Sequence, residues 1–360
     1  MKKITYQEVK YLLCNNVPDF EGKEIYIMGC GNTAQLYQEG LQREGLSEKI
    51  VAYCQNDSSY CGMIVFGREC VNPESLRGRN DIIVLVCTPQ PNVIKEMNAQ
   101  LDSLGVEHYL LEEAVLKNHS DEVLEVYDML YDEKSKDIYA NMLWCRLCGK
   151  YPEHDLITAN QYFCWSDFAN CDIGTKFVDC GAYVGDSMER YIWYKDGMVG
   201  RITCFEPDPN NFRTMQYRAE RLKKEWNLAE KSITLLPYGV SDISSEGVVQ
   251  EYSVNNGLGS KIMQENSLKG TSIKIVALDD IIDDRIDFLK ADIESYEYRM
   301  LLGAEKTIKK YNPCLAVSIY HNAVDYYSVP LLVHRMMPKA KIAVRHHSNT
   351  LAETVLYAWT

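Results

Sequence analysis

The stretch FVDCGAYVGD, residues 177–186, constrains the fold more than any other part of the sequence. It predicts a hydrophobic strand that runs into a glycine-rich turn and then into a helix, an order typical of nucleotide-cofactor sites in α/β proteins. Gly181 permits a tight turn, Gly185 lets backbone and ligand approach closely, and Asp179 places a carboxylate at the carboxyl end of the strand. The alternative is a glycine-rich turn with a purely structural role.

A second acid follows at the distance expected for ribose binding. RITCFE, residues 201–206, predicts the next strand, and Glu206 at its end is placed to accept hydrogen bonds from both ribose hydroxyls. The spacing Asp-x-Gly-x-x-x-Gly lacks the Gly-x-Gly-x-x-Gly phosphate cradle, and Asp179 stands where a pyrophosphate needs bare amide donors. A ligand with a ribose and a cationic end therefore fits better than an anionic dinucleotide, and S-adenosylmethionine has both.

Length and charge limit the class of protein. A chain of 360 residues predicts two domains, each with its own core. The formal net charge of -13 argues against nonspecific binding to nucleic acid or to anionic membranes, because both would repel the chain. No apolar run approaches the roughly 18 residues of a membrane span, and the start is amphipathic rather than a signal peptide. We expect a cytoplasmic protein that acts on a small molecule; the oligomeric state stays open, a homo-oligomer included.

The 13 cysteines are interpreted as reduced thiols, because several stand inside apolar strands as small buried hydrophobes. Cys145 and Cys148 form a Cys-x-x-Cys, but the next pair, Cys164 and Cys171, is separated by six residues rather than two. The first pair also stands near the predicted end of a helix. The pattern therefore favours core cysteines over a zinc site.

Residues 1–117 alternate strand and helix signals and predict a smaller, Rossmann-like domain with a parallel sheet, with GMIVF at residues 62–66 as one of its strands. Its first turn, GCGNTA at residues 29–34, matches Gly-x-Gly-x-x-Ala, which taken alone predicts NAD. The next strand, however, ends in Cys54 and Gln55 where a ribose-binding acid is expected, and no residue downstream in this half suggests hydride chemistry. Dinucleotide redox, binding of another nucleotide or sugar nucleotide, and a scaffold or oligomerisation role all stay open for this domain.

The remaining chain predicts a helical linker and a larger domain. Residues 118–150 have a helical pattern, with Ser120 as an N-cap and a polar break that starts at Asp132. Residues 151–360 repeat the alternation and give seven core strands, with SITLLPYGV as the third. The last two are joined too closely for a helical crossover and should pair antiparallel. The predicted fold class is α/β, a seven-stranded sheet preceded by the smaller Rossmann-like domain. With its antiparallel end, this sheet resembles the class I methyltransferase architecture.

Three acids mark the end of the fourth predicted strand of this sheet. The segment IDFLKADIESYEYRMLLGA, residues 286–304, delivers Asp292 and Glu294 at the strand end and Glu297 to the next helix. With the strand order 3-2-1-4-5, Asp179 and Asp292 face the same crevice at the topological switch point. For Glu294 and Glu297 the alternative is that they cap the following helix.

From about Gln161 to Thr360 the sequence resembles the FkbM family of S-adenosylmethionine-dependent methyltransferases. The resemblance is carried by FVDCGAYVGDS, FEPDPNNF, PYGVSD, FLKADIESYE with LLGA, and CLAVSIYH. The family usually has glycine after the first glutamate of the aspartate-x-glutamate-x-x-glutamate segment, where this chain has Ser295. The resemblance implies methyl transfer, most often to a hydroxyl oxygen of a sugar or secondary metabolite.

The resemblance also implies roles for the matching residues. The methionine and ribose part of S-adenosylmethionine is expected to contact Asp179, Gly181 and Gly185, and its ribose hydroxyls are expected to contact Glu206. Its adenine is expected to contact Ser241 and Asp242. The Tyr183 ring is expected to lie near the sulfonium. Asp242 has the alternative role of a turn residue. An unactivated hydroxyl needs a base, and the candidates are Asp292, Glu294 and His321. The same three side chains are able to ligate a divalent metal, but no metal site is predicted.

The acceptor is expected to lie under the β-rich stretch GVVQEYSVNNGLGSKI, which offers the polar side chains of Asn255, Asn256, Ser260 and Lys261. The alternative is a surface hairpin. The predicted function is O-methylation of a hydroxyl on a sugar-containing or secondary-metabolite small molecule. The competing predictions are an NAD-dependent oxidoreductase and a nucleotide-sugar-binding protein, each acting through residues 1–117.

Overall fold

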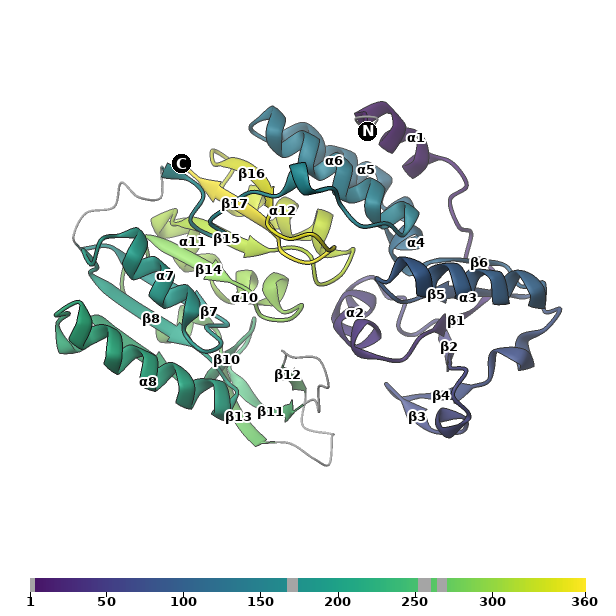
Figure 1. Cartoon of the computed structure of the whole chain (residues 1–360), viewed down its shortest axis with the longest axis horizontal. Coiled ribbons are helices and arrows are strands. Elements are labelled where there is room, and N and C mark those ends of the chain that lie inside the picture. Colours follow the sequence, from purple (N-terminus) through teal and green to yellow (C-terminus); the bar gives the residue numbers. More distant parts are fainter. Residues whose placement is uncertain (1–3, 167–173, 252–259, 264–270) are drawn as a thin grey trace. The chain divides into compact units, whose positions relative to one another are not determined.

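The computed structural model describes the chain except for residues 1–3, 167–173, 252–259 and 264–270. Two compact units make up the chain (Figure 1). The first consists of Met1–Ile157, Ile319–Leu331 and Val344–Thr354, and the second of Thr158–Ser318, Leu332–Ala343 and Val355–Thr360. Two segments from the C-terminal part of the chain therefore belong to the first unit.

The first unit is built on a six-stranded sheet with the order β3-β4-β2-β1-β5-β6. Its strands are β1 (Glu24–Met28), β2 (Ile50–Cys54), β3 (Ile64–Val65), β4 (Arg68–Val71), β5 (Ile82–Val86) and β6 (His108–Leu110). Its helices are α1 (Tyr6–Cys14), α2 (Asn32–Arg43), α3 (Pro91–Leu104), α4 (Leu111–Asn118), α5 (Ser120–Met129) and α6 (Glu133–Cys148). All neighbouring strands run parallel except β3 and β4. Without β3, the order is that of doubly wound sheets.

One strand prediction in this unit is wrong in extent. GMIVF, residues 62–66, supplies only the two-residue β3, because Phe66 and Gly67 both have positive φ angles and turn the chain into an antiparallel hairpin. The parallel partner of β2 is β4, which the sequence did not predict.

The predicted break in the helical stretch is confirmed, since α5 ends at Met129 and α6 begins at Glu133. Asp132 caps α6 by accepting a hydrogen bond from the Ser135 N–H. The predicted N-cap Ser120 is instead the first residue of α5, and His119 takes the cap position.

The second unit contains most of a seven-stranded sheet with the order β16-β17-β15-β14-β7-β8-β9. The strands are β7 (Lys176–Cys180), β8 (Arg201–Phe205), β9 (Ile233–Leu236), β14 (Phe288–Ala291), β15 (Cys314–Ser318), β16 (Lys341–His346) and β17 (Thr354–Trp359). β9, β8, β7, β14 and β15 pair in parallel, and β15 pairs antiparallel with β17. The predicted order 3-2-1-4-5 is therefore confirmed, and β17 departs from the parallel arrangement beside β15.

Helices and a second sheet accompany these strands. The helices are α7 (Asp186–Tyr194), α8 (Pro209–Glu225), α9 (Leu278–Ile281), α10 (Glu297–Gly303), α11 (Glu305–Tyr311) and α12 (Asp325–Met336). A four-stranded sheet holds β10 (Tyr238–Val240), β13 (Thr271–Val276), β11 (Ser245–Glu251) and β12 (Ser260–Met263), in that order. SITLLPYGV, predicted as one strand, divides between the two sheets at Pro237, because proline has no N–H to donate to a strand ladder.

The core of the second unit lies between the seven-stranded sheet and helices α7 and α8, which cover one face of it (Figure 1). Phe177 of β7 stacks on Tyr191 of α7 with ring centroids 4.3 Å apart, and Met215 of α8 is fully buried beside them. This packing fixes the strand ends from which the predicted site residues project. Among the described helices, none is both long and apolar enough to cross a membrane.

The described cysteines are all free thiols, and most of those inside strands are buried, as at Cys54, Cys180 and Cys204, whereas Cys314 is half-buried. Cys145 and Cys148 both lie on α6, where burial raises the pKa of Cys145 to about 12. A thiol with so high a pKa is a poor metal ligand, because metals bind the thiolate. Cys171 lies outside the described residues.

Candidate functional site

The glycine-rich turn after β7 is built around a contact that only glycine permits. Gly181 has a φ of +76°, and a Cβ atom there would lie 1.9 Å from the carbonyl oxygen of Asp292. The turn after β7 is therefore pressed against the end of β14. Gly185, with a φ of +80°, precedes α7, and a Cβ there would meet Met188 and Met215 at 2.9 and 3.1 Å. Both predicted glycines thus meet a steric and a conformational requirement.

Asp179 is fully buried and paired with a residue that sequence reasoning missed. The Lys290 Nζ in β14 lies 3.0 Å from Asp179 Oδ1 and donates to the carbonyl oxygen of Gly181 at 2.7 Å. Burial raises the pKa of the Asp179 carboxyl, and the Lys290 ammonium opposes this shift. Burial also acts to lower the pKa of Lys290, but the carboxylates of Asp179 and Asp292 outweigh it and leave that pKa raised. The sequence did offer one sign of this partner, because a lysine stands inside the otherwise apolar strand FLKADI.

Asp292 is half-buried at the end of β14 and accepts a hydrogen bond of 2.7 Å from the Tyr162 hydroxyl. The backbone N–H of Tyr162 donates to the Tyr357 hydroxyl at 2.9 Å, which anchors this tyrosine to β17. The Tyr162 ring centroid lies 5.2 Å from Lys290 Nζ. Tyr162 therefore joins Lys290 in surrounding the Asp292 carboxylate with donors and positive charge.

Glu206 follows β8 and is only 6% exposed. The Tyr183 N–H donates to its Oε2 at 2.8 Å, and the Asp208 N–H donates to its Oε1 at 2.9 Å. Burial raises the pKa of the Glu206 carboxyl to about 7, although these amide donors act to lower it. The Asn211 side chain also hydrogen-bonds this carboxylate. A carboxylate has about four lone-pair sites, so acceptor capacity remains on the pair of oxygens beside these donors. Such a pair suits two neighbouring hydroxyls of a ribose.

Ser241 and Asp242 form the turn after β10. The Ser241 Oγ donates to Asp242 Oδ1 at 2.9 Å, and Arg299 of α10 lies 3.4 Å from the other carboxylate oxygen. Gly303 at the end of α10 packs on this turn, because a Cβ there would lie 2.1 Å from the carbonyl oxygen of Ser241. The glycine of the LLGA motif thus lets α10 support the predicted adenine-binding turn.

The acidic segment after β14 contains two consecutive residues in the left-handed region. Glu294 has a φ of +55° and the buried Ser295 a φ of +78°. This conformation costs a side-chain-bearing residue roughly 1–2 kcal/mol and favours glycine. It explains why the resemblance leads one to expect glycine at position 295. Glu297 is buried and accepts a hydrogen bond from the Ile293 N–H at 2.7 Å, so its role in the turn before α10 is structural.

The other predicted residues differ in their surroundings. Tyr183 is 36% exposed with a φ of +47°, so its backbone contacts Glu206 while its ring stays accessible. His321 is 4% exposed, and its ring lies 4.1 Å from that of Tyr320. It belongs to the first compact unit, whereas the other predicted site residues belong to the second. Asn255 and Asn256 lie outside the described residues, and the side chains of Ser260 and Lys261 are not described.

The sheet order explains why the predicted cofactor residues gather. β14, β7 and β8 are neighbours, so Asp292, the Gly181 turn and Glu206 stand at the carboxyl ends of three adjacent parallel strands. Ligands of open α/β sheets bind at such an edge, next to the topological switch point. The site combines the Gly181 turn, the Asp179 carboxylate paired with Lys290, and the Asp292 carboxylate bound by Tyr162. Together with Glu206, these groups suit a ligand with a ribose and a cationic group.

Comparison with known proteins agrees with this fold. Residues 179–338 match the methyltransferase FkbM domain. The crystal structure of methyltransferase FkbM from Methylobacillus flagellatus KT covers 99% of this chain and 94% of its own, with 20% identity and a TM-score of 0.58. The SAH-bound methyltransferase PaMTH1 from Podospora anserina covers 68% of this chain and 96% of its own, with 10% identity and a TM-score of 0.31. No match was found among curated proteins. The first likeness confirms the predicted α/β fold of class I methyltransferase type.

Proposed function

Because residues 179–338 form a methyltransferase domain of the FkbM family, we propose that S-adenosylmethionine is its methyl donor and that the acceptor is a hydroxyl on a sugar-containing or secondary-metabolite small molecule. The observation that carries the choice of donor is Glu206, whose two carboxylate oxygens are oriented by backbone amides beside the glycine turn. This carboxylate fits a ribose, and it disfavours a phosphate at the same place because the two would repel each other.

The residues around Asp292 support a cationic ligand. Lys290 is committed to Asp179 and to the Gly181 carbonyl, so it neutralises the buried acid of the turn. The Tyr162 hydroxyl donates a hydrogen bond to Asp292, a carboxyl group at the strand end that attracts a cation when it is ionised. S-adenosylmethionine supplies an activated methyl group on a sulfonium, and an exposed Tyr183 ring adds a cation–π contact of about 0.5–2 kcal/mol.

On the acceptor side, a hydroxyl must lose a proton as it takes up the methyl group. Among the predicted set we assign the role of general base to His321, because imidazole is the side chain most often used for this step. Asp292 instead accepts the hydrogen bond from the Tyr162 hydroxyl. Glu294 is assigned to binding the acceptor, with its half-buried side chain on the turn after β14. Holding the acceptor oxygen in line with the methyl group supplies much of the acceleration.

The proposal is tested by ligand binding to the full chain. Isothermal titration calorimetry should show binding of S-adenosylmethionine and S-adenosylhomocysteine, and Glu206→Ala should weaken both by about 10-fold or more, because two ribose hydrogen bonds to a charged acceptor are lost. Gly31→Ala, in the other glycine turn, is the matched control and should bind both ligands as the natural chain does. Binding of NAD alone, abolished by Gly31→Ala and untouched by Glu206→Ala, would overturn the proposal.

Glu206 should also make binding depend on pH. Its pKa of about 7 means that the carboxyl is mostly protonated at pH 6 and mostly ionised at pH 8. The ionised form accepts two hydroxyl hydrogen bonds, so affinity for S-adenosylmethionine should rise about 10-fold between these pH values and then level off. Calorimetry at both pH values measures the change, and Glu206→Gln should bind weakly without this rise. An affinity of the natural chain that falls with pH over this range contradicts the assignment.

A further inference from the structure

The first unit has a crevice at the carboxyl ends of β1 and β5, the place where doubly wound sheets bind nucleotides. Here it is filled by the chain's own side chains. Its lining includes Tyr37, Cys87, Glu112, Arg146 and Leu351, and the cavity that remains is about 10 Å³. This holds about one water molecule, whereas small-molecule sites have roughly 300–1,000 Å³. The space that these residues enclose therefore has no room for a nucleotide.

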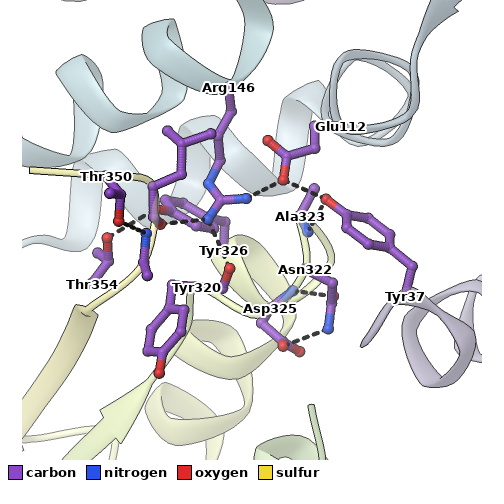
Figure 2. Close-up of polar contacts among 12 residues, drawn as sticks. Tyr37, Glu112, Arg146, Tyr320, Asn322, Ala323, Asp325, Tyr326, Thr350 and Thr354 are labelled. Carbon is purple, nitrogen blue, oxygen red and sulfur yellow. Dashed lines mark hydrogen bonds and ion pairs between the residues drawn. The ribbon is translucent and has the colours of Figure 1, made fainter. Parts of the chain in front are cut away.

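A buried ion pair fills the crevice. Arg146, near the end of α6, is 1% exposed and pairs with Glu112 of α4. The Tyr37 hydroxyl of α2 donates to the same glutamate oxygen at 2.6 Å, so three helices meet at one carboxylate (Figure 2). A buried arginine and glutamate are costly to desolvate unless their polar atoms find partners. The remaining partners of Arg146 show what the cluster holds.

Arg146 and Tyr37 hold two segments from the C-terminal part of the chain. They are residues 319–331, which include the start of α12, and residues 344–354, which include the end of β16. We call them the loop segments. The Arg146 Nη2 donates to the carbonyl oxygens of Tyr320 and Leu351 at 2.8 and 3.0 Å (Figure 2). The Tyr37 hydroxyl accepts a hydrogen bond from the Ala323 N–H at 3.1 Å. One arginine thus fixes the backbone of both loop segments.

Helix α2 adds a second set of contacts to the first loop segment. Arg43 pairs with the fully buried Asp325 at 2.5 Å and donates to the Ser328 hydroxyl at 2.8 Å. Gly40 makes room for the same segment, because a Cβ there would lie 2.8 Å from Asn322 Oδ1. Helix α2, which follows the glycine turn, therefore packs one face closely against this segment.

The opposite end of α6 binds the second loop segment. Asp132 accepts from both terminal nitrogens of Arg345, at 3.3 and 2.7 Å, and the Ser135 hydroxyl accepts from the Val344 N–H at 3.0 Å. Bidentate pairs of this kind are geometrically specific. Both ends of α6 are thus committed to the loop segments, through side chains that are largely buried.

One usual determinant of dinucleotide binding, the ribose-binding acid after the second strand, is also missing. The residue after β2 is Gln55, whose side-chain amide donates to Cys30 Sγ in the glycine turn at 3.6 Å. This position carries no carboxylate for a ribose. The glycine pattern at residues 29–34 is therefore present without a ribose acid, and the cavity lined by Tyr37 and Arg146 is filled.

We infer that the sheet of the first unit is a scaffold for the loop segments and does not bind a dinucleotide. The loop segments continue directly into β15, β16 and β17 of the seven-stranded sheet. His321 stands between Tyr320, which Arg146 holds, and Asn322, which α2 accommodates. The scaffold therefore fixes the backbone on both sides of His321. That this positions His321 to deprotonate the acceptor rests on the proposed function.

Hydrogen–deuterium exchange of the full chain, followed by mass spectrometry, tests the scaffold. Arg146→Met removes the ion pair and both carbonyl contacts while keeping an apolar stem, so exchange in residues 319–326 and 347–354 should rise by about 10-fold or more. Tyr37→Phe removes one hydroxyl and should raise exchange by about threefold, mainly in residues 319–326. Exchange in α7 and α8 should not change in either variant.

Arg79→Met is the matched control, because Arg79 forms exposed pairs with Glu24 and Asp81 in the same unit. It should leave the loop segments unchanged. The His321 Cε1–H signal in NMR, assigned with His321→Gln, should move in Arg146→Met and stay in place in Arg79→Met. If Arg146→Met fails to fold, Tyr37→Phe decides the outcome alone.

Two results overturn the inference: unchanged exchange of the loop segments in the folded variants, or calorimetric binding of NAD, NADP or UDP-glucose to the natural chain at concentrations up to about 1 mM. Binding of S-adenosylmethionine is measured on the same samples. Its absence counts against the proposed function alone, because the exchange pattern and the dinucleotide titrations do not depend on it.

Discussion

Gly181→Ala is expected to destabilise the second unit by roughly 3–5 kcal/mol and to abolish binding of S-adenosylmethionine. The substitution places a Cβ atom 1.9 Å from the carbonyl oxygen of Asp292 and gives a side chain to a residue with a φ of +76°. Because the obstructing atom belongs to the backbone of β14, it cannot turn aside as a side chain can. The turn must move away from the strand end, and the Lys290 contact to the Gly181 carbonyl breaks with it.

Urea unfolding followed by tryptophan fluorescence measures this loss. The second unit contains Trp165, Trp193, Trp226 and Trp359, so the signal mainly reports its unfolding. Gly174→Ala is the control in the same unit, because a Cβ there meets no atom within 4 Å. It should change stability by no more than about 0.5 kcal/mol. Equal effects of the two substitutions would show that the contact with Asp292 does not constrain Gly181.

The predictions at Gly181 and Glu206 rest on features that the sequence shows locally: a turn that needs a positive φ, and an acid directly after a strand. The contact of Gly181 with the Asp292 carbonyl joins residues far apart in the chain and was not predicted. The strand order could also be anticipated, because parallel strands joined by helices follow few topologies. The extent of the strands was harder to predict where a single residue decides it, as Pro237 does between β9 and β10.

What sequence reasoning missed are contacts between residues far apart in the chain. Lys290 looks out of place in an apolar strand until the neighbouring strand brings Asp179 to it. The role of Arg146 depends on carbonyl groups more than 170 residues away, which no spacing rule connects. For the same reason the glycine turn at residues 29–34 suggested a nucleotide, although the crevice beside it is filled.

Lys290→Met should cost roughly 3–5 kcal/mol of stability at neutral pH, the second large effect that we expect. Methionine keeps most of the apolar stem of lysine, so packing between β7 and β14 changes little. The Asp179 carboxylate, however, loses its only ion-pair partner among the described residues while staying fully buried. An uncompensated buried charge is far more costly than the pair from which it derives.

The double variant Asp179→Asn with Lys290→Met separates charge from shape. It removes both charges from the same space, so we expect it to lie about 1–3 kcal/mol below the natural chain, less than the sum of the single losses. The cycle is measured by urea unfolding with tryptophan fluorescence, as for Gly181. Additive losses would mean that the 3.0 Å pair contributes no coupling energy.

The pH dependence of Lys290→Met identifies the source of its loss. Without Lys290, burial raises the pKa of Asp179 above its value in the unfolded chain, and the neighbouring Asp186 and Asp292 raise it further. Between the pKa of Asp179 in the unfolded variant and its higher pKa in the folded variant, the folded state binds more protons than the unfolded state. The stability of the variant therefore falls as pH rises over that range. The deficit relative to the natural chain should be smaller at pH 5 than at pH 8. A deficit independent of pH would instead trace the loss to packing around the methionine, because packing does not titrate.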